Sequence, residues 1–393
     1  MWNLTNIDVT KMCEAFSILN REELFTDENV NVVYDKWFQS FHQVLENHVP
    51  HRTVVIRPRD KPWMNSLIRK SIRKRDRLLK LNSRYKTVST WERYKQQRNL
   101  TTSLIRSRKM EYYKNLNLKL QDPNLGSKKW WGLVKSIYGG KIQVTVPTLR
   151  EGCNMITDAK EKAQLLNEYF GTQCTLDNAD TDPQELSNNL NLRSISHIFT
   201  TNKEVNYLLK NVDISKACGV DGVGNNLIRL SADGISGSFS RFINLSLSSG
   251  VFPDAWKFAN VTSIFKKDDR QLIKENCRPV SLLPSLSKIN ERIVFIPLYN
   301  FLLDIKFLSP FQSGFRPGDS TVNQLIYIVH RIYEALDSGN EVRMVFLDIS
   351  KAFDKVWHKG LIPKLKYLGV REPLLDWIIS YLPGRKQRVV VDG

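Results

Sequence analysis

The chain of 393 residues is long enough for two or three domains, and its 41% hydrophobic content can supply their cores. No segment approaches the roughly 18 uninterrupted apolar residues of a membrane span, and the first residues lack the basic and apolar regions of a signal peptide. The five cysteines lie far apart, without the close Cys and His spacing of a zinc site. We therefore expect an intracellular protein with free thiols and no membrane contact.

Positive charge is concentrated in one segment of the chain. Residues 57–119 contain 20 Lys and Arg against four acidic residues, and this segment supplies most of the formal net charge of +18. Such a run can be no more than a solvated helix face, but an excess of this size is typical of surfaces that neutralise phosphates. We predict a nucleic-acid surface made by Arg69, Lys70, Arg73, Lys74, Arg75 and Arg77.

The first 200 residues are predicted to be mostly helical. Residues 1–60 form a helical connector, residues 61–125 a basic helical hairpin that breaks at Thr87–Thr90, and residues 126–200 a helical spacer with a polar loop. In the second arm of the hairpin, Trp91, Tyr94 and Tyr112 favour one side of the helix. Aromatic residues at this spacing are usually core contacts, and base-stacking platforms are the alternative.

Residues 201–393 alternate between helical and strand patterns. The sequence predicts a helix that begins at Ser320 or Thr321 and ends at Gly339, then a buried strand over 343–347 that ends at Asp348. A second helix is expected over 358–367. A final strand over 387–391 leads into a turn dipeptide with no partner strand after it, which predicts an unpaired edge.

Asp348 is the candidate catalytic residue. A carboxylate at the C-terminal end of a buried strand, followed by a tight turn, can hold a divalent metal where a phosphoryl group reacts. Taken alone, an Asp in this position is more often a turn or a helix cap. The residues around it decide between the two interpretations.

Four segments in a row resemble motifs of non-LTR retrotransposon reverse transcriptases, the LINE-type and jockey-like elements. FLDISKAFDKVWHKGLIPKLKYLGV is similar to the first catalytic motif of that family. NCRPVSLLPSLSKINERIV and QSGFRPGDST resemble the fingers motifs that precede it, and LLDWIISYLPGRKQRVVV resembles the segment that follows. The likeness extends back to about residue 60. It implies an α/β fold with the fingers and first half of the palm of a right-hand polymerase in 201–393, preceded by a mostly helical basic extension.

The resemblance also implies roles for single residues. Asp348 would bind Mg²⁺ or Mn²⁺ together with the Ile349 carbonyl, and Phe353 would pack under the incoming sugar. Asp354 is assigned to helix capping. The dNTP triphosphate would be held by Arg278 and by Lys267 or Lys266, and the fingers loop near the template would contain Gln312, Gly314, Arg316 and Gly318.

The resemblance further implies an aromatic-Ala-Asp-Asp hairpin that completes the metal site, and this sequence lacks it. The one adjacent acidic pair, Asp268-Asp269, precedes the motif that should come first. Some motif positions also depart from the family pattern: Asn290, for example, replaces an apolar residue, which puts the packing of the fingers in question. We therefore predict a reverse transcriptase that is catalytically incomplete as given.

The expected partners are an RNA template, a DNA primer and dNTPs, in the cytoplasm and nucleus. The alternatives are a non-catalytic RNA-binding module derived from a retrotransposon and a structural protein whose aromatic N-terminal helices pair with another chain.

Overall fold

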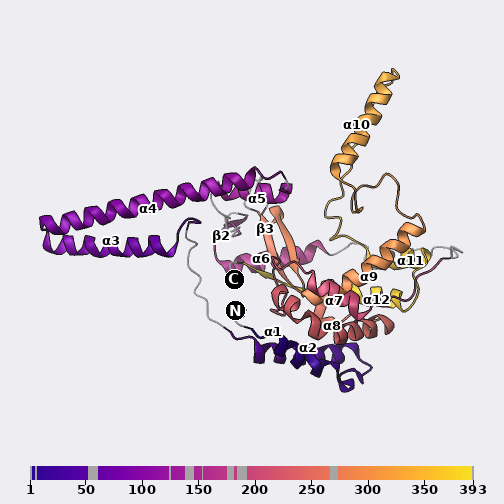
Figure 1. The fold of residues 1–393 in the computed structure, drawn as a ribbon. Helices are drawn as coiled ribbons and strands as arrows, with labels where there is room; N and C mark the ends of the chain where they lie inside the picture. The colour runs from indigo at the N-terminus through magenta and orange to yellow at the C-terminus, as the bar shows by residue number, and fades with distance from the viewer. Residues whose placement is uncertain are drawn as a thin grey trace. The chain divides into compact units, whose positions relative to one another are not determined.

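The computed structural model describes residues 2–4, 7–51, 61–123, 125–137, 146–152, 154–174, 181–183, 193–265 and 273–391. They divide into two compact units, one within Arg52–Val144 and one that joins Trp2–His51 to Thr145–Gly393 (Figure 1). The predicted segments 1–60, 61–125, 126–200 and 201–393 stay predictions. The two compact units do not follow these segments, because the helices within residues 1–60 belong to the larger unit. No helix in the described part of the chain is long and apolar enough to cross a membrane.

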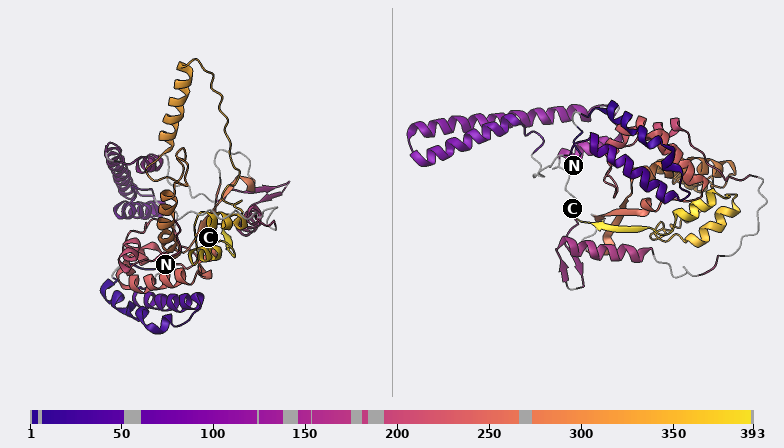
Figure 2. Two further views of the ribbon diagram at one scale, coloured as in Figure 1. Left: turned by 90° about the vertical axis from the view of Figure 1, so that its right-hand side faces the viewer. Right: turned by 90° about the horizontal axis from the view of Figure 1, so that it is seen from below.

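The smaller unit contains the predicted helical hairpin and the helix that follows it. It consists of α3 (Ser66–Tyr85), α4 (Val88–Leu120) and α5 (Ser127–Ile137) (Figures 1 and 2). Helix α3 begins at Asn65, whose side chain accepts a hydrogen bond from the Ile68 amide at 2.9 Å. Helix α4 begins at Thr87, which forms a reciprocal capping box with Thr90. The predicted break is therefore the turn between the two helices.

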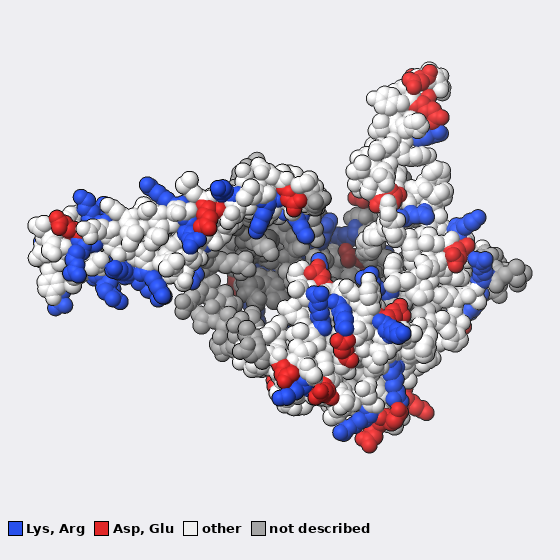
Figure 3. Space-filling model, viewed as in Figure 1, with Lys and Arg blue, Asp and Glu red and all other residues white. Residues whose placement is uncertain are grey.

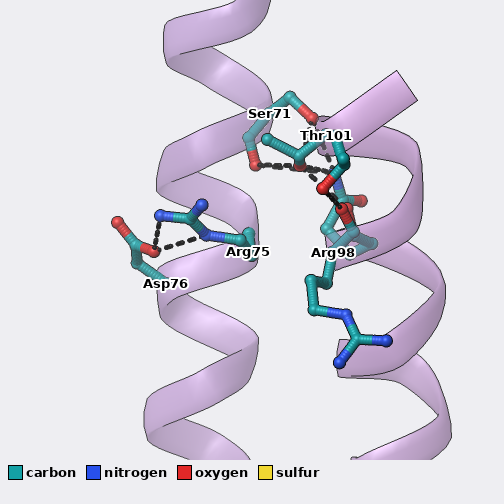
Figure 4. A network of polar contacts seen from close by, with 7 residues as sticks. Ser71, Arg75, Asp76, Arg98 and Thr101 are labelled. Atoms are coloured by element: carbon teal, nitrogen blue, oxygen red, sulfur yellow. Dashed lines mark hydrogen bonds and ion pairs between the residues drawn. The ribbon is translucent and has the colours of Figure 1, made fainter. Parts of the chain in front are cut away.

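A polar cluster lies in the seam between α3 and α4. Gln97 Nε2 donates to Ser71 Oγ at 2.9 Å, and the Ser71 and Thr101 hydroxyls lie 2.8 Å apart. All three side chains are buried, and Figure 4 shows Ser71 and Thr101 facing each other across the seam. Buried polar groups at a helix seam are satisfied only in one alignment of the two helices. The cluster therefore fixes the register of the hairpin.

The helical core of the larger unit is built on α8 (Asn225–Ser248) and α2 (Val30–His48). The indole of Trp37 is fully buried, stacks on Phe41 at 5.4 Å and donates to Ser238 Oγ at 3.0 Å. Around this pair lie α1 (Val9–Ala15), η1 (Phe16–Asn20), η2 (Glu22–Phe25), α7 (Asn202–Lys210), η3 (Asp254–Lys257), α9 (Ser285–Asp304) and α12 (Leu374–Tyr381).

The larger unit also holds a small mixed sheet. Strand β3 (Phe258–Phe265) pairs antiparallel with β4 (Cys277–Leu282), which follows η4 (Lys274–Asn276), and parallel with β5 (Lys386–Val390), in the order β4-β3-β5. Strand β5 therefore lies at the edge of the sheet, as predicted, but its inner side has a partner in β3 that the sequence analysis did not predict. Helix α6 (Ala159–Gln173) packs its Leu166 and Phe170 against the sheet. The hairpin of β1 (Leu149–Glu151) and β2 (Asn154–Ile156) lies beside this helix (Figure 2).

The segment between α9 and α12 contains the predicted helices and lacks the predicted strand. Helices α10 (Thr321–Asp337) and α11 (His358–Tyr367) form as expected, and Gly339 closes α10 with a φ of +73°. Residues 343–347 are exposed and form no strand, which corrects the prediction. A strand needs a neighbour to take its backbone hydrogen bonds, and no described strand pairs with this segment. None of the residues of α10 is buried either.

Candidate active site and nucleic-acid surface

Arg278, the predicted fingers cation, lies on β4, opposite Ile264 of β3. The antiparallel pairing fixes its backbone, and its side chain is exposed. Among the described residues it forms no hydrogen bond or ion pair, so the guanidinium is free to hold a phosphate. Lys266 and Lys267 lie outside the described residues, as does the Asp268-Asp269 pair.

The predicted fingers loop is held by its own hydrogen bonds. Gln312 Nε2 donates to the Gly314 carbonyl at 2.9 Å, and an Arg316 amino group donates to the Ser309 carbonyl at 2.8 Å. Gly318 has a φ of +82°, a conformation that favours glycine, as the sequence predicts for a tight turn. Phe315 also has a positive φ, and its ring is 83% exposed.

Asp348 and Ile349 lie in an exposed, irregular segment and not at the end of a strand. A turn over 350–355 follows, in which Lys351 has a φ of +54°. Asp354 lies in this turn, but α11 begins after Trp357, so the prediction that Asp354 caps a helix is wrong. The turn forms as predicted, but the strand that would orient the Asp348 side chain does not form.

Two of the predicted motif segments meet through exposed aromatic rings. The ring of Phe353 lies edge-on to that of Phe315, with centroids 5.8 Å apart. This contact joins the turn after Asp348 to the fingers loop. Phe353 is itself 78% exposed, and such a ring can pack against a ligand.

Tyr169, in the last two turns of α6, is a residue that sequence reasoning did not single out. The Lys351 ammonium donates to its hydroxyl at 3.2 Å and lies 5.1 Å from its ring centroid, and Lys274 lies 6.0 Å from the same ring. Lys274 also pairs with Glu151 at 2.8 Å, and this hydrogen bond raises the pKa of the ammonium group. No sequence motif marks Tyr169, because its contacts with Lys351 and Lys274 arise from the packing of α6 against the sheet.

The structure does not bring all of the predicted site residues together. No hydrogen bond, ion pair or ring contact among the described residues joins Arg278 to Asp348 or Phe353. In the same part of the chain, no group of three His, Cys, Asp or Glu side chains could hold a metal ion. Asp348 with the Ile349 carbonyl does not by itself make a metal site of the kind that two-metal catalysis requires.

The predicted nucleic-acid residues lie along α3. Arg69, Lys70, Arg73, Lys74 and Arg77 are exposed, and basic side chains outnumber acidic ones on the visible face of the hairpin (Figure 3). Arg75 differs, because its guanidinium donates to Asp76 at 2.7 and 2.9 Å on the same helix (Figure 4). Because Asp76 neutralises its charge, Arg75 should bind a phosphate more weakly than the other five residues.

One aromatic prediction for the hairpin is wrong. Trp91 is 46% exposed and is not a core contact, whereas Tyr94 and Tyr112 are half-buried. Tyr85, which the sequence did not single out, is 56% exposed at the end of α3. The helical spacing of α4 is correct, but a hairpin of two helices buries only one narrow face of each.

Comparisons with known proteins agree with these motifs. Residues 264–393 match a family model described as reverse transcriptase (RNA-dependent DNA polymerase). The chain is 38% identical over 194 residues to the RNA-directed DNA polymerase from mobile element jockey of Drosophila melanogaster, which is 49% of this chain and 21% of that protein. It is 34% identical over 189 residues to the probable RNA-directed DNA polymerase from transposon BS of the same species, again 21% of the relative.

A third relative is the probable RNA-directed DNA polymerase from transposon X-element of Drosophila melanogaster, 38% identical over 136 residues, or 34% of this chain and 15% of the relative. The chain thus matches about a fifth of the length of these proteins. All three relatives are described as RNA-directed DNA polymerases.

Proposed function

We propose that this chain supplies the fingers and first palm segment of a non-LTR retrotransposon reverse transcriptase, because residues 264–393 match a reverse transcriptase family model and the chain is similar to the RNA-directed DNA polymerase of mobile element jockey. Its reaction is DNA synthesis on an RNA template. The observation that carries the proposal is the contact between Phe315 and Phe353, which joins two of the motif segments at an exposed surface.

Arg278 is proposed to bind the triphosphate of the incoming dNTP. Its position on a paired strand limits the motion of its backbone, and its exposed guanidinium has no competing partner in the described part of the chain. A guanidinium can donate two parallel hydrogen bonds to one phosphate, which a lysine cannot do. Lys266 or Lys267 would add a point charge beside it.

The fingers loop and the turn after Asp348 are proposed to bind template and sugar. The loop keeps its shape through the hydrogen bonds of Gln312 and Arg316, so little order would have to be gained on binding. Gly314 and Gly318 leave its backbone accessible, because they carry no side chain. Phe353 offers an exposed ring on which a deoxyribose can pack.

Reverse transcriptases use divalent metal ions, and Asp348 is proposed to be one ligand of Mg²⁺ or Mn²⁺, with Ile349 adding its carbonyl. The sequence has no aromatic-Ala-Asp-Asp segment to supply the further carboxylates. We therefore expect no dNTP incorporation by this chain in a primer-extension assay with Mg²⁺ or Mn²⁺. Clear incorporation would show that the site is more complete than the sequence implies.

The basic hairpin is proposed to bind nucleic acid for the polymerase. The purified chain should bind an RNA template annealed to a DNA primer, with an affinity that falls steeply as salt rises, because bound phosphates release counterions. The double variant Arg73→Glu and Lys74→Glu should weaken this binding. It should also lower the slope of log affinity against log salt by about one for each phosphate that is no longer neutralised.

A matched control has the same change in net charge at a different place. Lys203→Glu with Lys216→Glu reverses two exposed cations on or near α7. Binding by this control should stay close to that of the unaltered chain. Equal losses in both double variants would mean that net charge, and not the hairpin, attracts the nucleic acid.

Genomic sequence distinguishes the polymerase from a binding module. The reading frame of an active copy should encode the aromatic-Ala-Asp-Asp segment beyond the codon for Gly393. A stop codon directly after Gly393 in every copy would contradict a polymerase and leave only nucleic-acid binding.

A further inference from the structure

We propose that the tip of the basic hairpin, defined as residues 84–95, stacks on unpaired nucleotides of a single strand. This inference rests on the proposed nucleic-acid role of the hairpin and names the class of ligand that its tip would take. Tyr85 ends α3, Trp91 lies in the first turns of α4, and both rings are about half exposed, at 56% and 46%. Exposed aromatic rings on a positively charged surface are the usual elements of single-strand binding sites.

The turn that carries the two rings is preorganised. Lys86 takes a left-handed conformation with a φ of +50°, and its amide donates to the Asn82 carbonyl at 2.8 Å. Thr90 donates to the Asn82 side chain at 3.0 Å and closes the capping box with Thr87. These bonds tie the end of α3 to the start of α4, so the tip loses little freedom when a ligand binds.

The two rings are also held by their neighbours. Trp91 packs against half-buried Tyr94, with centroids 5.7 Å apart, which limits the rotation of the indole. The Arg84 guanidinium lies 5.6 Å from the ring centroid of Tyr85. A cation placed beside an aromatic ring can contact a phosphate while the ring stacks on the adjoining base.

Charge at the tip suits a phosphate backbone. Residues 84–95 contain Arg84, Lys86, Arg93 and Lys95 against the single acid Glu92. The structure records no ion pair for these four cations within the described residues, and all four are exposed. The tip therefore presents free positive charge together with two rings.

Stacking selects the ligand. In a double helix each base already stacks on its neighbours and is turned away from the protein, whereas an unpaired base offers a free face. The tip should therefore prefer a loop or a single strand to a blunt duplex. RNA and DNA share this chemistry, so the experiment compares both.

The test uses the full chain and fluorescence anisotropy with labelled oligonucleotides of about 12 nucleotides, near the upper range of single-strand site sizes. The probes are oligo-uridine, oligo-thymidine and a blunt RNA duplex of the same length. The double variant Tyr85→Ala and Trp91→Ala should bind both single strands about tenfold more weakly, or weaker still, because stacking on each ring is lost. Its affinity for the duplex should change less than about twofold.

Two further variants separate stacking from folding. Tyr85→Phe with Trp91→Phe keeps both rings and should restore most of the single-strand affinity. Val88→Ala removes an exposed apolar side chain that is 76% accessible at the same tip and should have no effect. A duplex affinity that falls as much as the single-strand affinity, or phenylalanine variants that bind no better than the alanine variant, would overturn the proposal.

The proposed function and this inference fail in different ways. If the unaltered chain binds neither the single strands nor the duplex, both the nucleic-acid role of the hairpin and the inference are wrong. If the chain binds all probes, and the alanine variant binds them equally well, only the stacking site is wrong. A loss confined to the uridine probe would support the site and identify RNA as its ligand, and a loss confined to thymidine would identify DNA.

Discussion

Replacement of Asn290 by leucine should make the protein more stable. Asn290 lies on α9 with none of its surface exposed, and neither Oδ1 nor Nδ2 has a hydrogen-bond partner among the residues that the structure describes. A buried polar group without a partner costs about 1–3 kcal/mol. Leucine has the same branching, so methyl groups would take the place of the two polar atoms.

The magnitude follows from two opposed effects. Removal of the unpaired amide should stabilise the folded state, and the slightly larger leucine side chain should cost part of that gain through tighter packing. We expect the free energy of unfolding to rise by about 2 kcal/mol. With a urea dependence of about 3 kcal/mol per molar, the unfolding midpoint should move up by about 0.7 M.

Asn244 provides the matched control. Its Oδ1 accepts from the Thr200 amide at 2.9 Å, and its Nδ2 donates to the Thr200 carbonyl at 3.0 Å. Asn244→Leu makes the same chemical change but breaks both bonds, so its midpoint should fall. If Asn290→Leu also lowered the midpoint, the amide of Asn290 would have partners in solution, and the reasoning from unpaired burial would be refuted.

Three more perturbations test other parts of the structure. Trp37→Ala should lower the free energy of unfolding by about 3–5 kcal/mol in urea titration, because the indole is fully buried in the helical core; a loss below about 1 kcal/mol would separate residues 2–51 from that core. Burial raises the pKa of Asp221 to about 6, so the folded state should lose stability as pH rises from about 4 through 6. Asp221→Asn should remove this loss, and unfolding midpoints that fall in parallel for both proteins would contradict it. Gln97→Ala should speed amide hydrogen exchange in α3 and α4, because Ser71 loses a buried partner; unchanged exchange would show that the polar seam does not hold the hairpin.

The sequence predicted the helices better than the sheet. The ends of α10 and α11 and the turn at Thr87 are local features, set by caps, glycines and apolar spacing, and the structure confirms them. Residues 343–347 have an equally clear strand pattern, yet a strand is completed by a neighbour that local sequence does not specify. For the same reason, the pairing of β5 with β3 could not be predicted from the residues of β5 alone.

The candidate site was found through motifs and not through geometry. Four motif segments in the family's order, and not the positions of single residues, predicted the similarity to reverse transcriptases, and the comparisons agree with it. Tyr169 carries no motif and was missed, because its contact with Lys351 arises from the packing of α6. The exposure of Trp91 was missed because helical spacing does not say how wide a face the partner helix covers.

The exposed apolar side chains of α10 should determine how readily the protein associates with other proteins. Leu325, Ile326 and Tyr333 are each at least 60% exposed on this helix, and Val345–Leu347 beyond it are still more open. Apolar patches of this kind adhere to one another and are captured by chaperones that survey newly made chains. The half-life of the protein in a cell should therefore depend on how soon those side chains become buried against another surface, and less on the stability of its helical core.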